Sequence, residues 1–396
     1  MNLLKTITAG ALALAAASAF GQAKEIRIAH IYGKTGALEA YGKQTQAGLM
    51  LGLEYATGGK MELLGRRIVV LEKDDQIKPD IAKSALAAAY GDDKADIAVG
   101  PTSSASALAM LPVAEEYKKI LLVEPAVADS ITGDKWNRYI FRTARNSSQD
   151  AIAAAVATPP NAQIAMLAQD YAFGRDGVKA MKEALAAVGS KAQIVHEEYV
   201  PQATTDFTAA AQRMFDALKD KPGRKIIGII WAGPNPVTKI ADLKPERFHI
   251  ELAPGGNILP VMKTWKDLAG VEGAIYYYYG FPKNKTNDWL VAEYKKRYGG
   301  APPDFFVAGG MAAGIALVEA IRKAGGTDTE KLIAAMEGLS FDSPKGPMTF
   351  RKEDHQALQA MYHFKIKKSQ KDEWDLLDLV HEIPAKDIPL PVRNKR

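Results

Sequence analysis

Hydroxyl side chains are concentrated just after a predicted strand. The run Ile97–Val99 is apolar, Gly100-Pro101 ends it, and hydroxyls occupy four of the next five positions, Thr102–Ser106. Apolar residues recur at helical spacing from Leu108 onward, so a helix is expected to begin among the hydroxyls. A helix N-terminus offers unpaired backbone N–H groups and a partial positive charge, and hydroxyls add donors. One hydroxyl is enough to cap a helix, so four predict a seat for a small anion such as a carboxylate.

Signs of catalytic or metal chemistry are weak. The six histidines are scattered, and no zinc-protease HExxH helix, GxSxG elbow or Walker loop occurs. The chain has no cysteine, which excludes disulfides and thiol metal sites. The net charge of +5 is spread along the chain, and no stacking aromatics accompany its densest basic run, 365–371. We therefore expect no enzyme activity, no metal, no cofactor and no nucleic-acid partner.

The first residues are typical of a secretory signal peptide. Lys5 precedes an apolar stretch over 7–17, and small residues at Ala17-Ser18-Ala19 or Gly21-Gln22-Ala23 offer a cleavage site. The apolar stretch is shorter than the roughly 20 residues that cross a bilayer. We predict a signal peptide over 1–23 and an exported protein, and expect no later segment to be apolar enough to span a membrane.

Predicted strands and helices alternate along the rest of the chain. This rhythm is typical of βαβ units, so we expect an α/β fold with parallel sheets flanked by helices. At about 370 residues the mature chain suggests two domains. The predicted strands are 26–31, 67–71, a short strand at 97, 163–167, 193–200, 225–230 and 274–281. The predicted helices are 41–56, 79–90, 174–188, 205–218, 289–298 and 308–324. The tail from Met348 alternates apolar and polar residues, as antiparallel strands do.

Six short motifs, in order along the chain, resemble one protein family. They are Ile28–Gly36 with Ala40-Tyr41-Gly42; Gly100–Ser104; Val123-Glu124-Pro125-Ala126; Phe141-Arg142-Thr143; Gln169–Gly174; and Gly346–Phe350. Over its whole mature length the chain resembles the type I periplasmic solute-binding proteins of ABC transporters, in particular the leucine/isoleucine/valine-binding branch.

The resemblance implies a two-lobed protein that closes about a hinge on a ligand held in the cleft. The chain should cross between lobes three times, near 141–145, 274–281 and 343–350. The expected organisation is a signal peptide over 1–23, a first lobe of 24–142 plus 276–345, and a second lobe of 143–275 plus 346–396. Ligands of open α/β sheets sit beyond the carboxyl ends of the strands, which indicates the same cleft.

The resemblance also assigns site residues. The ligand carboxylate should meet Ser103, Ser104 and the amides around Ala105. Ala126 belongs to the same first-lobe wall. The expected aromatic walls are Tyr41, Tyr171, Phe173 and Trp231, and for each of these ordinary lobe packing is the competing interpretation.

Two departures from the family pattern bear on the ligand. Amino-acid binders of this family hold the ligand ammonium with a Thr after the Pro-Ala element and a Glu in a second-lobe turn, where this chain has Ala128 and Gly255. Burying an ammonium without partners costs several kcal/mol, against only about 8 kcal/mol for micromolar binding. An aromatic acid, such as a benzoate-, hydroxycinnamate- or aryl-keto-acid-like carboxylate, therefore fits better. Glu124 is the alternative ammonium partner.

The predicted function is the periplasmic substrate-binding subunit of an ABC importer. The expected partners are a small carboxylate and membrane permease subunits, and the expected state is a monomer without direct membrane insertion. Two alternatives stay open: binding of a branched-chain or other hydrophobic amino acid, and a periplasmic ligand sensor on the same fold.

Overall fold

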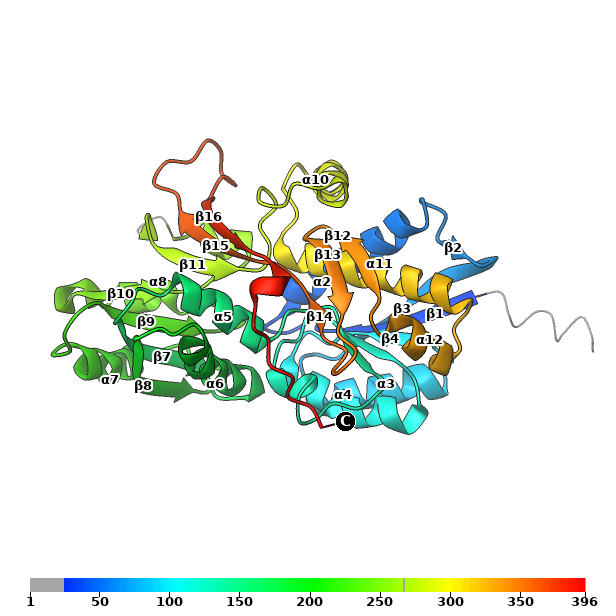
Figure 1. The fold of residues 1–396 in the computed structure, drawn as a ribbon, viewed down its shortest axis with the longest axis horizontal. Helices are drawn as coiled ribbons and strands as arrows, with labels where there is room; N and C mark the ends of the chain where they lie inside the picture. The colour runs from blue at the N-terminus through cyan, green and yellow to red at the C-terminus, as the bar shows by residue number, and fades with distance from the viewer. Residues whose placement is uncertain (1–24, 266–267, 396) are drawn as a thin grey trace, which may run out of the picture.

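The computed structural model describes residues 25–265 and 268–395, so the predicted signal peptide lies outside the described residues. Two lobes lie side by side in Figure 1, each built on a largely parallel sheet. The first sheet has the strand order β2-β3-β1-β4-β5-β6, in which only the β2–β3 pair is antiparallel. Its strands are β1 (Glu25–Tyr32), β2 (Glu62–Leu63), β3 (Arg66–Asp74), β4 (Ile97–Val99), β5 (Leu121–Val123) and β6 (Ile140–Arg142).

The helices of the first lobe pack in pairs on its sheet. α2 packs on α11 and α3 packs on α4, with the two pairs on opposite faces of the sheet (Figure 1). The helices are α2 (Glu39–Ala56), α3 (Pro79–Gly91), α4 (Ser104–Tyr117), α10 (Lys285–Arg297), α11 (Phe305–Ala324) and α12 (Thr329–Met336). A small antiparallel sheet of β12 (Ser340–Ser343), β13 (Gly346–Phe350) and β14 (Ala357–Leu358) completes the lobe.

The second lobe is a four-stranded parallel sheet in the order β10-β9-β7-β8. Its strands are β7 (Gln163–Gln169), β8 (Gln193–Val200), β9 (Lys225–Ile230) and β10 (Ile250–Ala253). Its helices are α5 (Ser147–Ala157), α6 (Ala172–Ala187), α7 (Thr208–Leu218), α8 (Val237–Ala241) and α9 (Leu259–Met262). An antiparallel sheet of β11 (Glu272–Ile275), β15 (Met361–Ile366) and β16 (Leu377–Ile383) lies beside α5.

Three segments join the lobes, at 143–146, 276–284 and 359–360. The third differs from the sequence prediction of 343–350, because β13 pairs with β12 and Phe350 packs on Phe141 of β6. Residues 346–358 therefore belong with the first lobe, and the chain enters the second lobe about ten residues later. The predicted strand over 274–281 is also shorter than expected, since β11 ends at Ile275 and the tyrosines that follow lie in the second crossing.

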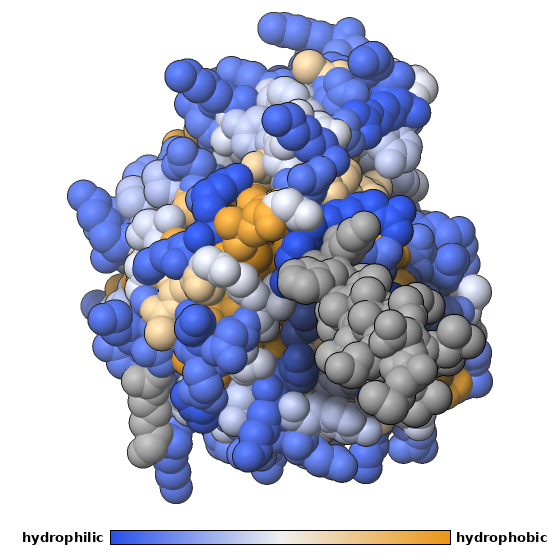
Figure 2. Space-filling model, turned by 90° about the vertical axis from the view of Figure 1, so that its right-hand side faces the viewer, coloured by the Kyte–Doolittle hydropathy of each residue, from blue (hydrophilic) through white to orange (hydrophobic). Residues whose placement is uncertain are grey.

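Helix α11 corrects the expectation that no later segment is apolar enough to span a membrane, but only as regards its length and composition. Within the described part of the chain it is the one helix that is long and apolar enough by length and composition. However, 89% of its most apolar stretch is buried inside the protein, against α2. Hydrophilic residues cover most of the first-lobe end of the molecule, around a limited apolar area (Figure 2). The extent to which α11 is buried is typical of a core helix.

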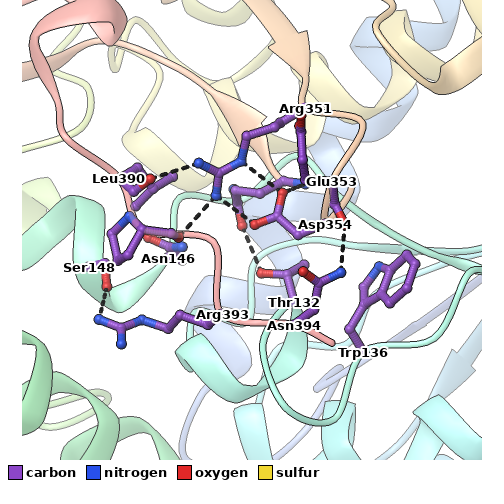
Figure 3. A network of polar contacts seen from close by, with 12 residues as sticks. Thr132, Trp136, Asn146, Ser148, Arg351, Glu353, Asp354, Leu390, Arg393 and Asn394 are labelled. Atoms are coloured by element: carbon purple, nitrogen blue, oxygen red, sulfur yellow. Dashed lines mark hydrogen bonds and ion pairs between the residues drawn. The ribbon is translucent and has the colours of Figure 1, made fainter. Parts of the chain in front are cut away.

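The C-terminal segment 388–395, here called the strap, returns across the junction of the lobes (Figure 3). Arg351 donates to the carbonyl of Leu390 at 2.7 Å, and Asn394 donates to the carbonyl of Glu353 at 2.6 Å, so the strap is tied to the first lobe. Arg393 donates to Ser148 Oγ at 3.1 Å, at the start of α5. The strap therefore contacts both lobes on one side of the hinge.

Candidate functional site

A small pocket of about 60 Å³ lies between the lobes, where the strands of both sheets end. The first lobe contributes the starts of α2, α4 and α11 and the loop after β5. The second lobe contributes the segments that follow β7, β9 and β10. The lining residues are Leu38, Tyr41, Thr102, Ser104, Pro125, Ala126, Val127, Arg145, Tyr171, Phe173, Trp231, Ala232, Gly256, Asn257, Phe305 and Phe306. Six of the eight predicted site residues are thus brought together.

Two hydroxyl residues at the start of α4 have different roles: Ser103 caps the helix, and Ser104 lines the pocket. Ser103 is the N-cap of α4, and its Oγ accepts from the amide of Ala105 at 3.3 Å. Neither Ser103 nor Ala105 lines the pocket. For Ser103 and Ala105 the capping interpretation holds. Ser104 lines the pocket, and its Oγ accepts from the amides of Val127 and Ala128 at 3.3 and 3.1 Å. Both bonds use the oxygen as acceptor, which leaves the hydroxyl proton of Ser104 for a ligand acceptor.

Aromatic rings form the walls of the pocket. The ring of Tyr41 packs on Phe306 at 4.4 Å, and Tyr171 packs on Phe173 at 5.9 Å between ring centroids. Trp231 follows β9 and meets Phe207 edge-on at 5.1 Å. Tilted and edge-on pairs of this kind hold rings in fixed positions, so the walls are preformed for a flat or apolar ligand body.

Two hydrogen bonds join the lobes beside the pocket. The amide of Gly233 in the second lobe donates to Tyr41 Oη at 3.0 Å. The amide of Leu259 donates to Asp304 Oδ2 at 2.7 Å, at the start of α11. Burial raises the pKa of Tyr41 to about 12, so its phenol stays protonated and keeps a proton to donate. The two lobes therefore contact each other directly in this structure.

Arg145 is the charged residue of the pocket, and sequence reasoning did not assign it to the site. It lies in the first crossing with its side chain 13% exposed, and it pairs with Asp150 at 3.2 Å. Its guanidinium carbon lies 4.4 Å from the ring centroid of Tyr276 and 6.0 Å from that of Phe306. Burial alone would lower the pKa of Arg145, but Asp150 raises it on balance, so the cation is retained. The predicted first crossing, near 141–145, contains Arg145, but no sequence pattern indicated that its side chain lines the pocket.

Glu124, the alternative ammonium partner, does not line the pocket. It is 1% exposed, accepts from Thr143 Oγ1 at 3.0 Å, and occupies the space that a Cβ on Gly309 would need. Ala128 uses its amide on Ser104, and Gly255 also lies outside the pocket. Among the described residues, the side chains that line the pocket include no carboxylate, and Arg145 is their only charged group.

Because burial raises the pKa of Glu124 to about 7, its contribution to stability depends on pH. Between about pH 4.5 and 7 the folded protein keeps a proton that the unfolded chain releases, so raising the pH disfavours folding. Relative to E124Q, the wild type should lose about 2–3 kcal/mol of unfolding free energy between pH 5 and pH 8. Urea unfolding of both proteins at the two pH values measures the difference, and parallel pH profiles would contradict it.

The two neighbouring serines should respond differently to alanine substitution. S104A removes a pocket donor and should weaken carboxylate binding by about 10- to 100-fold, the worth of a charged hydrogen bond. S103A removes the cap of α4 and should lower stability by about 1 kcal/mol with little change in affinity. Calorimetric titration with 4-hydroxybenzoate, alongside thermal unfolding, separates the two effects. Equal losses of affinity in both variants would contradict the assignment.

Comparison with known proteins identifies the family. Residues 25–371 match the family model for periplasmic binding proteins, so the chain belongs to the periplasmic binding protein family. It is thus a substrate-binding protein of an ABC transporter, which confirms the resemblance seen in the sequence. Such proteins work in the periplasm, bind small molecules, deliver them to membrane permeases, and are in general not enzymes.

Individual relatives cover most of the chain. An ABC-type branched-chain amino acid transporter protein from Rhodopseudomonas palustris is 64% identical, with a TM-score of 0.82 over 94% of this chain and 100% of that one. A solute-binding protein from R. palustris BisB5, solved with 3,4-dihydroxybenzoic acid, is 28% identical, with a TM-score of 0.79 over 91% of this chain and 98% of that one. Leu/Ile/Val-binding protein homolog 6 of Brucella abortus is 24% identical over 277 residues, 66% of this chain and 68% of the relative.

Proposed function

We propose that this protein captures an aromatic carboxylate in the cleft between its lobes and presents it to the permease of an ABC importer. The supporting observation is the charge of the pocket: one buried guanidinium, that of Arg145, stands among aromatic walls with no carboxylate to receive an ammonium. Arg145 turns its Nε to Asp150, which leaves its other N–H groups, together with the Ser104 hydroxyl, to bind a ligand carboxylate.

The aromatic walls support the ring of the ligand. Tyr41, Tyr171, Phe173 and Trp231 come from both lobes, so a flat body placed between them gains contacts only when the cleft closes. A ligand shifts the open–closed equilibrium by its difference in affinity for the two forms, and contacts made from both lobes supply that difference. The solved relative from R. palustris BisB5 holds an aromatic acid and is consistent with this ligand class.

Binding of a branched-chain amino acid is the second candidate. It is favoured by the relative that is 64% identical, an ABC-type branched-chain amino acid transporter protein. It requires an ammonium partner, and the carboxylates of Glu124, Asp304 and Asp150 all lie outside the lining of the pocket, the last of them already paired with Arg145. Burial raises the pKa of Asp304 to about 6 and that of Glu124 to about 7, so both are poorer counter-ions than exposed carboxylates. The aromatic acid therefore remains the better match.

A thermal-shift and calorimetric screen of the mature protein tests the proposal, after unfolding and refolding to remove any carried ligand. The probes are benzoate, 4-hydroxybenzoate, cinnamate and phenylpyruvate against leucine, valine and phenylalanine. Saturation at 100-fold above Kd should raise the stability by about 2.7 kcal/mol. Stabilisation by the acids alone is expected. Stabilisation by the amino acids alone would overturn the proposal in favour of the second candidate.

A further inference from the structure

The second lobe contains a cavity of about 520 Å³ directly beside the cleft pocket. It lies between the parallel sheet, helices α5 and α6, and strand β11, which pairs with β15 instead of continuing that sheet. Apolar side chains and glycine form its inner wall. They include Ala154, Met166, Met181, Ile226, Gly228 and Leu252.

The cavity and the cleft pocket share part of their lining. Arg145, Phe173, Trp231, Gly256 and Phe305 line both. The guanidinium that serves the cleft therefore stands where the cleft meets the cavity. A carboxylate bound at Arg145 would therefore lie at the boundary of the two spaces, and an apolar tail would extend from it past the shared residues toward the cavity.

The sizes of the two spaces show why this direction matters. In this structure the cleft pocket holds about 60 Å³, whereas a cavity of roughly 150 Å³ holds benzene. As it stands here, the cleft pocket admits a ring only if its walls move apart. The adjoining cavity, at about 520 Å³, has room for a ring and several methylene groups.

The far rim of the cavity is polar, and apart from the exposed Lys368 its charged groups are paired with one another. Arg224 Nε donates to Glu251 at 3.0 Å, and Glu272 pairs with His363 at 2.9 Å and Lys365 at 3.4 Å. Because these charges neutralise one another, they offer no counter-ion to a second charged end of a ligand. Beyond Asp150, which pairs with Arg145, the wall toward this rim is largely apolar and suited to hydrocarbon.

We propose that the second-lobe cavity receives the apolar body of the ligand, and that the preferred ligand is an aryl-alkanoic acid whose ring is separated from its carboxylate by several methylene groups. This inference rests on the proposed function, since it places the carboxylate at Arg145. It adds that ligand length is selected inside one lobe, away from the closing surfaces.

The test is a length series of acids titrated calorimetrically into the wild type: benzoate, phenylacetate, 3-phenylpropionate and 4-phenylbutyrate. Each methylene buried in an apolar cavity is worth about fourfold in affinity, less the cost of fixing a bond rotation. We expect 4-phenylbutyrate to bind at least tenfold more tightly than benzoate.

The variant A154F fills the cavity from α5. It should reduce the preference for 4-phenylbutyrate over benzoate by at least tenfold. The matched control is V156F, which adds a ring at an exposed position of the same helix and should keep the wild-type preference. If A154F fails to fold by circular dichroism, A154L makes the same test with a smaller group. Xenon NMR, which needs no carboxylate, should detect the cavity in the wild type and lose the signal in the filled variant.

The outcomes separate the two proposals. An affinity that rises with length and is flattened by the filling variant supports the inference. If benzoate binds and longer acids bind no better, or the filling variant keeps the preference, the inference is overturned while the proposed function stands. If xenon enters the cavity but none of the acids binds, the proposed function fails, and this inference fails with it.

Discussion

Replacing Arg145 with methionine should weaken the binding of benzoate and 4-hydroxybenzoate by about 100-fold. The guanidinium is the only charged side chain that lines the cleft pocket among the described residues. Hydrogen bonds between charged partners contribute about 1.5–3 kcal/mol each, and a buried carboxylate left without its cation also loses the compensation for its desolvation. Calorimetric titration of the refolded R145M protein gives the Kd directly.

Two controls isolate the cation. R175M removes an exposed arginine of α6 that pairs with Asp170, and it should leave the affinity unchanged. R145M/D150A tests whether the loss comes instead from leaving Asp150 without its partner. The double variant should bind as weakly as R145M. If it binds like the wild type, or if R145M itself stays within threefold of the wild type, the carboxylate lies elsewhere.

Most of the fold could be predicted from the sequence because its strands are short, apolar and bounded by turn residues. Strands β8 and β9 begin and end where the sequence predicts, at 193–200 and 225–230. The errors occur where an alternating segment suits more than one sheet. The alternation in Gly346–Phe350 suits a strand in either lobe, and only its pairing with Ser340–Ser343 decides which.

The tyrosine run shows a second limit of sequence reasoning. Four consecutive tyrosines, 276–279, have high strand propensity, yet they lie in an interlobe crossing. Tyr277 donates to Asn287 at 2.7 Å and Tyr278 donates to the carbonyl of Trp374 at 2.5 Å, so tertiary hydrogen bonds override propensity there. Of the four, Tyr276 alone lines the second-lobe cavity.

The residue types of the site could be predicted from the sequence, but not which hydroxyl caps the helix and which one faces the pocket. The sequence indicates hydroxyls at a helix start, but whether a given one faces the helix or the cleft depends on the rotation of α4. That rotation makes Ser103 the cap and places Ser104 in the pocket. Arg145 and the second-lobe cavity depend on the angle between lobes and on the gap beside β11, neither of which has a local signature.

A glycine seam between α2 and α11 leads to the prediction with the largest expected effect on stability. At Gly48, Gly52, Gly310 and Gly314 an added Cβ would lie under 3.0 Å from backbone atoms of the facing helix. Contacts between backbones leave no flexible side chain to move aside, so accommodating a methyl group requires the helices to separate.

G310A should therefore lower the free energy of unfolding by about 2–3 kcal/mol, even though alanine favours a helix over glycine by up to about 1 kcal/mol. The matched control is G91A, at the end of α3, where the new methyl group would meet only the hydroxyl of the exposed Tyr117 at 3.2 Å. Urea unfolding of both variants measures the difference. Equal stabilities would show that the seam relaxes without cost.

The same seam connects stability with binding. The start of α2 carries Tyr41 and the start of α11 carries Phe306, and their rings pack at 4.4 Å in the wall of the pocket. Separating the helices moves these two rings apart and weakens the aromatic wall. Folded G310A should therefore also bind 4-hydroxybenzoate less tightly than G91A does, because the packing that stabilises the first lobe also sets the width of the ligand site.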